Sequence, residues 1–303
     1  MCLTVKGGKA VLQINGRKLQ LTNLDKILWP EDSYTKYELL RFYIDISPFL
    51  LPYLASRPCS FQRFPDGIHG KHFYQKNVPS FAPDWIQTFP VFSGKRTVNY
   101  ILVNNLETLV YVVNLGCLEI HPWHSQTAAI KYPDWGIVDL DPQEEVDFSA
   151  VVESAGVVKT VLDELGLYGY PKTSGATGMQ IYLPFKPHYT YEQVRDIIGY
   201  ICRLTHEKAP QLTTLERMVK KRGAKVYLDY LQNGWGKTIN APYTVRPVSG
   251  APVSTPLSWE EALSGKIAPR DFTIKNLLTR LQGKGDIFSP VLGGSQVLPL
   301  HLL

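Results

Sequence analysis

Two aspartates stand two residues apart at the end of the apolar segment Trp135-Gly-Ile-Val-Asp139-Leu-Asp141-Pro142. On a β-strand, residues i and i+2 face the same side, with Cα atoms about 6.5–7 Å apart. Ionised carboxylates are expensive to bury without a counter-charge. The spacing therefore predicts that Asp139 and Asp141 share one or two divalent cations, and their oxygen ligands favour Mg²⁺ or Mn²⁺ over zinc. The alternative is a strand end with two solvated aspartates.

A further carboxylate, Asp229, lies in a segment at 225–230 in which apolar and polar residues alternate. The alternation points Asp229 away from the apolar face of a strand. The segment follows the run RMVKKRGAK (217–225), which carries five basic residues and no acid. Such a run is either a solvated face or a phosphate-binding loop. Spacing alone leaves other third ligands open, namely Asp134, Asp147 and Glu119.

Two segments carry side chains suited to phosphate. The Gly-rich turn Thr173-Ser-Gly-Ala-Thr-Gly178 could present backbone N–H groups to a phosphate, or it could be a tight connection between a helix and a strand. His121, in His121-Pro-Trp-His124, follows an apolar segment without the further Cys or His that a zinc site needs. It is better suited to be a phosphate or proton partner.

The N-terminal third adds cations and aromatic residues. Asn23, Lys26 and Lys36 frame a loop and the start of a helix, where anions are attracted, although they could also be ordinary surface residues. Phe73 and Tyr74 stand beside a lysine, an arrangement suited to stacking unpaired bases. Buried loop anchors are the alternative for this aromatic pair.

The composition restricts the protein class. A hydrophobic fraction of 44% and a charged fraction of 19% in 303 residues exclude wholesale disorder. No apolar run reaches the ~18–20 residues of a membrane span, and the first residues do not resemble a secretion signal. The cysteines at 2, 59, 117 and 202 are too scattered for a zinc ribbon or a disulfide framework. We expect a cytoplasmic protein.

Strands and helices of an α/β or α+β fold must position these residues. Asn15-Gly16 predicts a hairpin, and a helix should begin near Ser33 or Thr35 and end before Pro48. The remaining predicted strands are Val98–Val103, Leu109–Val113, Gly136–Asp141, Met179–Pro184 and Lys225–Tyr230. The remaining predicted helices are Val151–Leu165, Tyr191–Lys208, Trp259–Leu263 and Asp271–Leu281.

In their order along the chain, these motifs resemble the polymerase domain of DNA ligase D, a branch of the archaeo-eukaryotic primase superfamily that works in non-homologous end joining. The resemblance runs over nearly the whole chain and rests on LTNLDKILWP, HGKHFYQKNVP, NLGCLEIHPWHS, DLDP, KTSGATGMQIYLP and KVYLDYLQNGWGKTINAPYTVRPVSGAPVSTPLSW. It implies a primase-like α/β (α+β) core with two sheets forming a cleft, plus an N-terminal hairpin and helix region. The expected organisation is a single domain, 1–303, with an end-binding subregion at 1–95 and the catalytic core with C-terminal elements at 96–303.

The resemblance also implies roles for individual residues. A two-metal site for Mn²⁺ or Mg²⁺ would be held by the catalytic carboxylates Asp139, Asp141 and Asp229. The incoming nucleotide would be bound by His121, Ser174, Arg246 and Gln180. DNA would be bound by Asn23, Lys26 and Lys36 at a 5′-phosphate, by Phe73 and Tyr74 at the template, and by Arg222 in a loop near the end.

The chain departs from the family in the Ser-Gly-rich segment. Thr177 and Gln180 stand where the family usually has Lys and His. Glutamine donates a hydrogen bond but carries no charge at neutral pH, so triphosphate affinity or rate could be lower. The carboxylates, His121 and Ser174 are all present, so loss of activity is not implied.

The resemblance predicts a template-directed polymerase that fills short gaps at double-strand-break ends, prefers rNTPs over dNTPs and works in the prokaryotic nucleoid. Expected partners are 5′-phosphorylated or gapped DNA, nucleotides, Ku and an ATP-dependent DNA ligase, and no membrane. A de novo primase and a non-catalytic 5′-phosphate-binding module are the alternatives, with a metal nuclease a weaker competitor. The chain carries no KxDG ligase motif.

Overall fold

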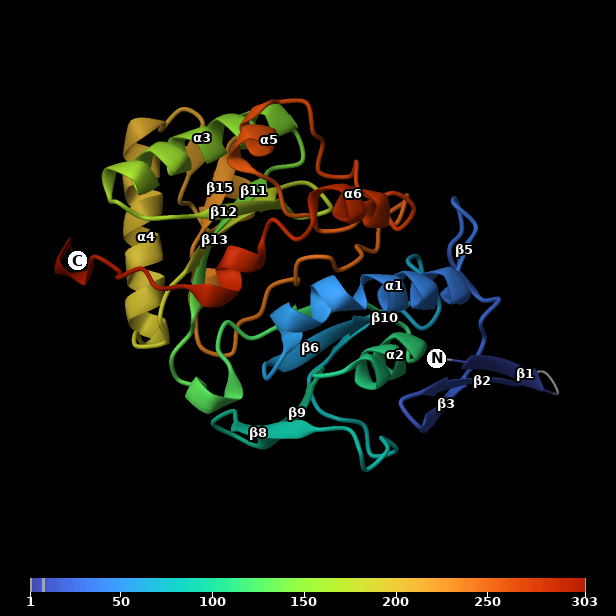
Figure 1. Ribbon diagram of the computed structural model, residues 1–303. Coiled ribbons are helices and arrows are strands. Elements are labelled where there is room, and N and C mark those ends of the chain that lie inside the picture. Colours follow the sequence, from blue (N-terminus) through green and yellow to red (C-terminus); the bar gives the residue numbers. More distant parts are fainter. Residues whose placement is uncertain (1, 7–8, 303) are drawn as a thin grey trace.

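The chain is described here from a computed structural model, which covers residues 2–6 and 9–302 (Figure 1). Met1 and Leu303, the bounds of the predicted single domain, lie outside these residues. The helices are α1 Lys36–Leu54, α2 Leu106–Asn114, α3 Phe148–Glu164, α4 Tyr191–Lys208, α5 Trp259–Leu263 and α6 Leu277–Lys284. Short 3₁₀ turns occur at Thr127–Ala129, Val219–Lys221, Leu231–Asn233, Ser289–Gly293 and Leu300–Leu302.

The strands form three sheets and a short pair. The N-terminal sheet is β1 Cys2–Lys6, β2 Lys9–Ile14 and β3 Arg17–Leu21, and the pair is β4 Ile27–Trp29 with β5 Tyr34–Thr35. The second sheet has the order β10 Cys117–Pro122, β6 Pro58–Arg63, β9 Thr97–Leu102 and β8 Thr88–Phe92, with β7 Phe73–Gln75 also on β6. The third has the order β12 Tyr170–Thr173, β13 Met179–Pro184, β11 Trp135–Pro142, β15 Val226–Asp229 and β14 Thr213–Thr214. Among the paired strands of the described chain, β14 and β15 are parallel and the rest antiparallel.

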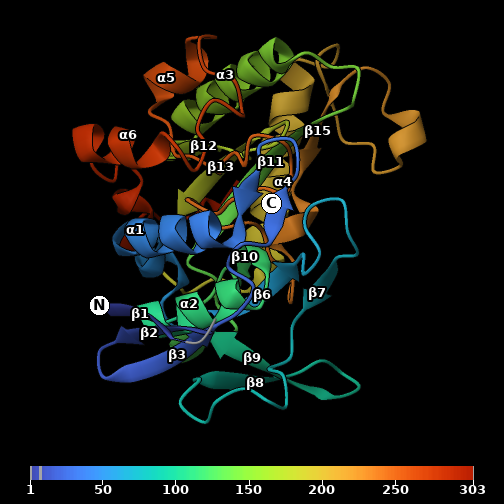
Figure 2. The ribbon, with the colours of Figure 1, turned by 90° about the vertical axis from the view of Figure 1, so that its right-hand side faces the viewer.

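The third sheet separates an apolar face from a polar one. Val138 and Leu140 on β11 face the core beneath α3 and α4, together with alternate residues of β13 and β15. Their neighbours Asp139 and Asp141 therefore face the other side, as the period of two requires. Figures 1 and 2 show α3 and α4 with this sheet in one half, and α1 and α2 with β6 and β10 in the other.

The prediction of a strand at Leu109–Val113 is wrong, because this segment lies inside helix α2. Asn105 caps the helix by accepting a hydrogen bond from the Thr108 N–H at 2.9 Å. Leu109, Val110, Val112 and Val113 are all buried, so both sides of the helix are apolar. A short continuous apolar run does not distinguish a buried helix from a buried strand. Here the segment forms a capped helix that packs against α1.

The predicted end of the first helix before Pro48 is also wrong. Helix α1 begins after Thr35, as predicted, and Thr35 forms a capping box with Glu38. It then continues through Pro48 and Pro52 to Leu54. Proline at 48 leaves the Ile44 carbonyl without its usual N–H partner, and the Ser47 hydroxyl donates to that carbonyl at 2.8 Å. Burial of Leu50 and Tyr53 adds packing that holds the last turns in place.

The other predicted elements lie close to their expected positions. The Asn15-Gly16 hairpin joins β2 to β3, and the helix at 191–208 and the strand at 179–184 have the predicted bounds. The last helix begins at Leu277 rather than Asp271, because Thr273 forms a β-bridge with Pro252 instead of a helical turn. No helix in the part of the chain that the structure covers is long and apolar enough to span a bilayer.

Candidate active site

Four polar residues form one row across the polar face of the third sheet. Asp139 on β11 lies opposite Asp229 on β15 and opposite Gln180 on β13, and Gln180 lies opposite Lys172 on β12. Directly opposite residues on antiparallel strands have Cβ atoms about 4.5–5.5 Å apart. The sheet register thus brings the predicted carboxylates Asp139 and Asp229 side by side, with Asp141 two residues further along β11.

This row concentrates negative charge. Burial, together with the neighbouring carboxylates of Asp229 and Asp141, raises the pKa of Asp139 to about 7. Like charges directly opposite each other on a sheet are destabilising. A cation between the carboxylates would relieve that repulsion, and a set of aspartate oxygens is what Mg²⁺ or Mn²⁺ takes. The residues therefore fit the predicted metal.

Arg222 is the counter-charge that the chain itself supplies. Its Nη1 donates to Asp141 Oδ2 at 3.2 Å, and its guanidinium stacks 3.8 Å from the centre of the Tyr227 ring. Asp229 accepts hydrogen bonds from the Leu231 N–H and the Gln232 amide. With these contacts, no three His, Cys, Asp or Glu side chains among residues 2–6 and 9–302 form a metal-binding group.

The three competing third ligands are engaged elsewhere. Asp134 pairs with Arg57 at 2.6 Å, Asp147 caps α3, and Glu119 pairs with Arg246 at 2.7 Å. None of them lies in the row of the third sheet. Asp229 remains the third carboxylate that the sheet register supports.

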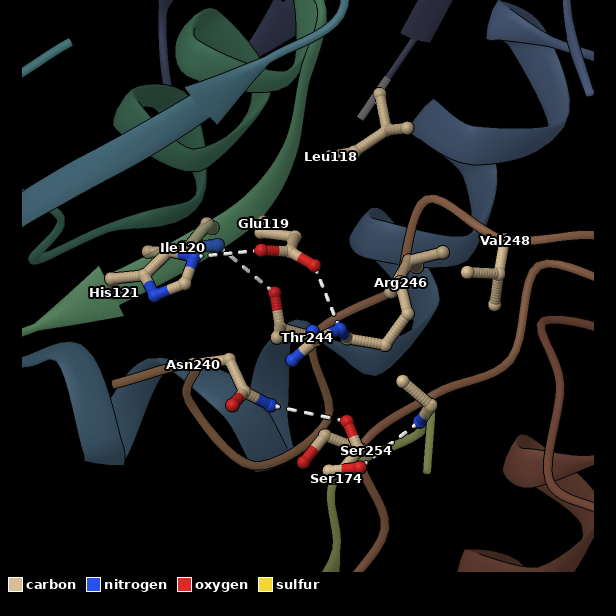
Figure 3. Close-up of polar contacts among 12 residues, drawn as sticks. Leu118, Glu119, Ile120, His121, Ser174, Asn240, Thr244, Arg246, Val248 and Ser254 are labelled. Atoms are coloured by element: carbon tan, nitrogen blue, oxygen red, sulfur yellow. Dashed lines mark hydrogen bonds and ion pairs between the residues drawn. The ribbon is translucent and has the colours of Figure 1, made fainter. Parts of the chain in front are cut away.

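The opposite wall of the site belongs to β10, whose residues Glu119 and His121 share one face (Figure 3). Thr244 Oγ1 accepts a hydrogen bond from the Ile120 N–H at 3.1 Å, and the Ala241 N–H donates to the Ile120 carbonyl at 2.9 Å. These bonds lay the segment 240–246 along β10. Arg246 thereby reaches Glu119.

Both walls line one cavity of about 830 Å³. Asn240 joins them, because its Nδ2 donates to the Ser174 carbonyl at 3.4 Å and its Oδ1 accepts from the Gln180 amide at 3.3 Å. The sequence-predicted residues that line this cavity are Asp139, Asp141, His121, Ser174, Gln180, Arg246 and Tyr74.

The Ser-Gly-rich turn at 173–178 connects different elements from those predicted. It joins two strands, β12 and β13, rather than a helix and a strand. Ser174 Oγ accepts hydrogen bonds from the N–H groups of Ala176, Thr177 and Gly178, so these donors already have a partner within the turn. A Cβ at Gly178 would collide with the Leu140 carbonyl, which explains why this turn beside the aspartates requires glycine.

The N-terminal cations lie apart from the residues that line the cavity. Lys36 is only 5% exposed, and its Nζ donates to the Thr22 carbonyl at 2.5 Å. Burial, together with the nearby charges of Lys26 and Arg63, lowers the pKa of Lys36 to about 8. Lys26 pairs with Asp66 at 2.7 Å, and Asn23 has a φ of 51° in the loop before it. Lys26, Lys36 and Arg63 therefore form a cationic cluster, which we call the N-terminal basic cluster.

Phe73 and Tyr74 are 46% and 56% exposed, so the alternative of buried loop anchors is wrong. The Arg63 guanidinium lies 5.1 Å from the Phe73 ring centre, which links this residue to the N-terminal basic cluster. The Tyr74 ring lies edge-on to His121 at 5.6 Å between centroids. The aromatic pair thus bridges the N-terminal basic cluster and the cavity.

Comparisons with known proteins identify the family. The family model of the LigD primase-polymerase domain matches residues 35–288. The chain belongs to this family. The bifunctional non-homologous end joining protein LigD of Bacillus subtilis is 37% identical over 94% of this chain and 46% of its own length. The multifunctional LigD of Mycolicibacterium smegmatis is 29% identical over 90% of this chain and 36% of its own length.

A solved structure extends the LigD likeness to the fold. The polymerase domain of Mycobacterium tuberculosis ligase D, in complex with DNA, matches with a TM-score of 0.85 and 25% identity. The match covers 92% of this chain and 99% of that domain. The predicted family and the primase-like α/β fold are confirmed. The chain spans less than half the length of the LigD relatives above.

Sequence reasoning missed two polar residues that lie at the candidate site, Lys172 and Asn240. Lys172 is fully buried, and its Nζ donates to Gln180 Oε1 and Ser254 Oγ, each at 2.5 Å. Its position opposite Gln180 follows from pairing the two strands around the Ser-Gly turn, a signal that the sequence contains. Asn240 could not be found in this way, because it comes from an irregular segment that only the folded chain places between the walls.

Proposed function

We propose that this chain is a template-directed nucleotidyltransferase that adds nucleotides to a primer 3′-OH at gaps and broken DNA ends. The observation that carries the proposal is the pairing of an aspartate row with a wall of His121 and Arg246 across one cavity. Carboxylates on one side suit metal ions, and the guanidinium and imidazole on the other suit phosphates. Membership in the LigD primase-polymerase family supports the same reaction.

In the proposed reaction, the 3′-oxygen attacks the α-phosphorus of the incoming nucleotide and the bond to pyrophosphate breaks. Asp139, Asp141 and Asp229 would hold two divalent ions, Mn²⁺ or Mg²⁺. When bound, such ions lower the pKa of the attacking hydroxyl and offset the charge of the leaving group. His121 and Arg246 would orient the triphosphate, with Ser174 and Gln180 beside it on the third sheet. Arg222 donates to Oδ2 of Asp141, so this oxygen becomes available as a ligand when Arg222 releases it.

The DNA end would lie along the N-terminal third. The N-terminal basic cluster, with Asn23, offers charges for a 5′-phosphate, and the exposed rings of Phe73 and Tyr74 offer stacking surfaces for template bases. Arg222 would contact the DNA end after leaving Asp141. We further propose that residues 1–303 act as one domain, with an end-binding subregion at 1–95 and the catalytic core at 96–303.

The wider assignments follow from the LigD relatives. Proteins of that name function in non-homologous end joining, which supports a cytoplasmic, nucleoid-associated site of action with Ku and an ATP-dependent ligase as partners. The preference for rNTPs over dNTPs is part of the same proposal.

Single-nucleotide extension on a gapped duplex tests the function. The duplex carries a 5′-phosphate or a 5′-hydroxyl at the gap, and the reactions compare ATP with dATP in Mn²⁺ and in Mg²⁺. We expect templated addition, stimulated by the 5′-phosphate. Release of nucleotides would indicate a nuclease, and dinucleotide synthesis without a primer would indicate a primase. Tight 5′-phosphate binding without any addition would leave an end-binding module.

The pH dependence of end binding should report on Lys36. Its pKa of about 8 lies below the ordinary lysine value, so the ammonium loses its proton as the pH rises from 7 to 9. We expect the affinity for a 5′-phosphorylated duplex, relative to its 5′-hydroxyl counterpart, to fall over this range. Fluorescence anisotropy of labelled duplexes measures it.

The matched control for this titration is Lys36→Arg, since arginine stays charged throughout. It should remove the pH dependence while keeping the preference for the phosphate. A wild-type preference that stays constant to pH 9 would mean that Lys36 does not contact the phosphate.

A further inference from the structure

Glu119 is a buried carboxylate in the wall of the cavity that the proposed reaction does not use. It is 2% exposed, on β10 between the apolar residues Leu118 and Ile120. Burial alone would raise the pKa of Glu119, but Arg246 and then His121 lower it below its ordinary value, so the group is ionised at neutral pH. A buried charge of this kind needs a reason, since it costs free energy unless it is paired.

Each oxygen of this carboxylate contacts a different side chain, Arg246 or His121 (Figure 3). Oε1 lies 2.7 Å from Arg246 Nε, and Oε2 lies 2.8 Å from His121 Nε2. The strand fixes the second contact, because residues two apart on β10 share a face. The first is fixed by the backbone, since the Arg246 N–H donates to the Pro252 carbonyl at 2.7 Å.

These two contacts decide which atoms remain for a ligand. The ion pair places Glu119 against Nε of the Arg246 guanidinium, although the two atoms are not aligned for a hydrogen bond. It leaves the two Nη groups, the edge that binds phosphate through paired hydrogen bonds. Glu119 also contacts Nε2 of the His121 imidazole. Nδ1 is therefore the ring nitrogen that does not contact Glu119. Both side chains line the cavity.

We propose that Glu119 is a positioning residue for the nucleotide: it holds His121 and Arg246 so that Nδ1 and the Nη edge meet the triphosphate together. This inference rests on the proposed function, because it assigns the triphosphate to these two side chains. Glu119 does not touch the nucleotide.

The proposal and simple electrostatics predict opposite results when the charge is removed. Glu119→Gln makes the wall more positive, so attraction alone would strengthen the binding of a polyanion. The amide has one acceptor and one donor group, however, so it no longer places an acidic oxygen against both Arg246 and His121 as the carboxylate does. Positioning therefore predicts weaker binding.

The test measures the affinity of the whole chain for ATP and for inorganic tripolyphosphate by calorimetry in Mn²⁺. We expect Glu119→Gln to weaken both about tenfold or more, and to raise the KM for nucleotide in gap filling more than it lowers kcat. Unchanged or tighter binding by a folded Glu119→Gln protein would overturn the proposal. A wild type that binds neither probe would also overturn it.

Two further variants separate positioning from loss of fold. Glu261→Gln removes a carboxylate that pairs with Arg280 and Lys284, away from the cavity, and should lower the unfolding temperature without changing ATP affinity. Arg246→Lys removes the fork that Glu119 orients. Adding Glu119→Gln to it should then cost far less than Glu119→Gln alone, whereas full additivity would contradict the proposal.

Gap filling by the wild type is measured in the same experiment. Its result distinguishes a failure of the proposed polymerase function from a failure of the proposed role of Glu119. Absence of nucleotide addition with ATP binding intact would contradict the proposed function. The binding comparison between wild type and Glu119→Gln would still decide the role of Glu119.

Discussion

We expect Asp139→Ala to abolish nucleotide addition while the binding of 5′-phosphorylated DNA ends stays intact. Asp139 stands at the centre of the polar row, opposite Asp229 and two residues from Asp141. Its removal therefore leaves Asp229 and Asp141 without the carboxylate that neighbours them both. Removing a group that hydrogen-bonds to a metal ligand lowers metal affinity or activity about 10–100-fold. Removing a ligand itself should lower the rate of nucleotide addition more, by at least about 10³-fold. Single-turnover extension on a gapped duplex measures the rate.

The stability of a variant at the same position should show that the loss of nucleotide addition is not caused by unfolding. Burial, Asp229 and Asp141 raise the pKa of Asp139 to about 7, above the about 3.9 of an unfolded chain. The folded state therefore favours the protonated carboxyl, and its stabilising contribution is lost as the pH rises from about 4 through 7. In EDTA at pH 8, Asp139→Asn should raise the unfolding temperature.

Asp147→Ala is the matched control, because Asp147 caps α3 and lies outside the cavity lining. Because helix α3 loses its N-cap, Asp147→Ala should lower the free energy of unfolding by about 0.5–2 kcal/mol. Its rate of nucleotide addition should equal that of the wild type. If Asp139→Ala retained more than a tenth of the wild-type rate, the carboxylate row would not be the catalytic site. A fall in the unfolding temperature of metal-free Asp139→Asn would contradict the charge argument.

Local signals predicted the elements that carry the carboxylates. Asp139 and Asp141 end a strand whose apolar residues alternate with them, and Asp229 does the same on β15, so the period of two was visible in the sequence. The antiparallel register that sets Asp139 against Asp229 was not visible. It depends on the pairing of segments almost a hundred residues apart, which the motif resemblance implied and local patterns did not.

Prediction failed where tertiary packing overrode local preference. The β-branched residues of 109–113 favour a strand, yet they form a helix that is buried on both sides. Proline at 48 would end an isolated helix, but burial of the following residues of α1 stabilises helical structure as far as Leu54. Glu119 looked like a competing metal ligand, because nothing in the sequence shows that Arg246 would lie against it. In each case the deciding contact comes from a distant segment.

We expect Asp134→Ala to destabilise the fold by about 3 kcal/mol, near the lower end of the range for breaking a buried pair because Asp134 is itself 20% exposed. Arg57 is 1% exposed and donates to both carboxylate oxygens of Asp134, at 2.7 and 2.6 Å. Its guanidinium also lies 3.5 Å from the Trp135 ring centre. Without Asp134, this buried cation has no counter-charge.

The pair matters for the site because of where its members lie. Arg57 directly precedes β6, which pairs with β10 and its His121, and Asp134 directly precedes β11 with its Asp139. The ion pair thus joins the starts of the strands that support the two walls of the cavity. Breaking it should loosen the spacing between the walls before the whole chain unfolds, so ATP affinity should weaken at temperatures below the unfolding midpoint.

Urea unfolding measures the stability change. Glu164→Ala, which breaks the exposed pair with Lys208, is the control and should cost no more than about 1 kcal/mol. Replacing both members, as Arg57→Met with Asp134→Leu, should cost less than Asp134→Ala alone, because no charge is then left buried. A double variant as unstable as the single one would mean that the cation–ring contact at Trp135, rather than the ion pair, holds the two sheets together.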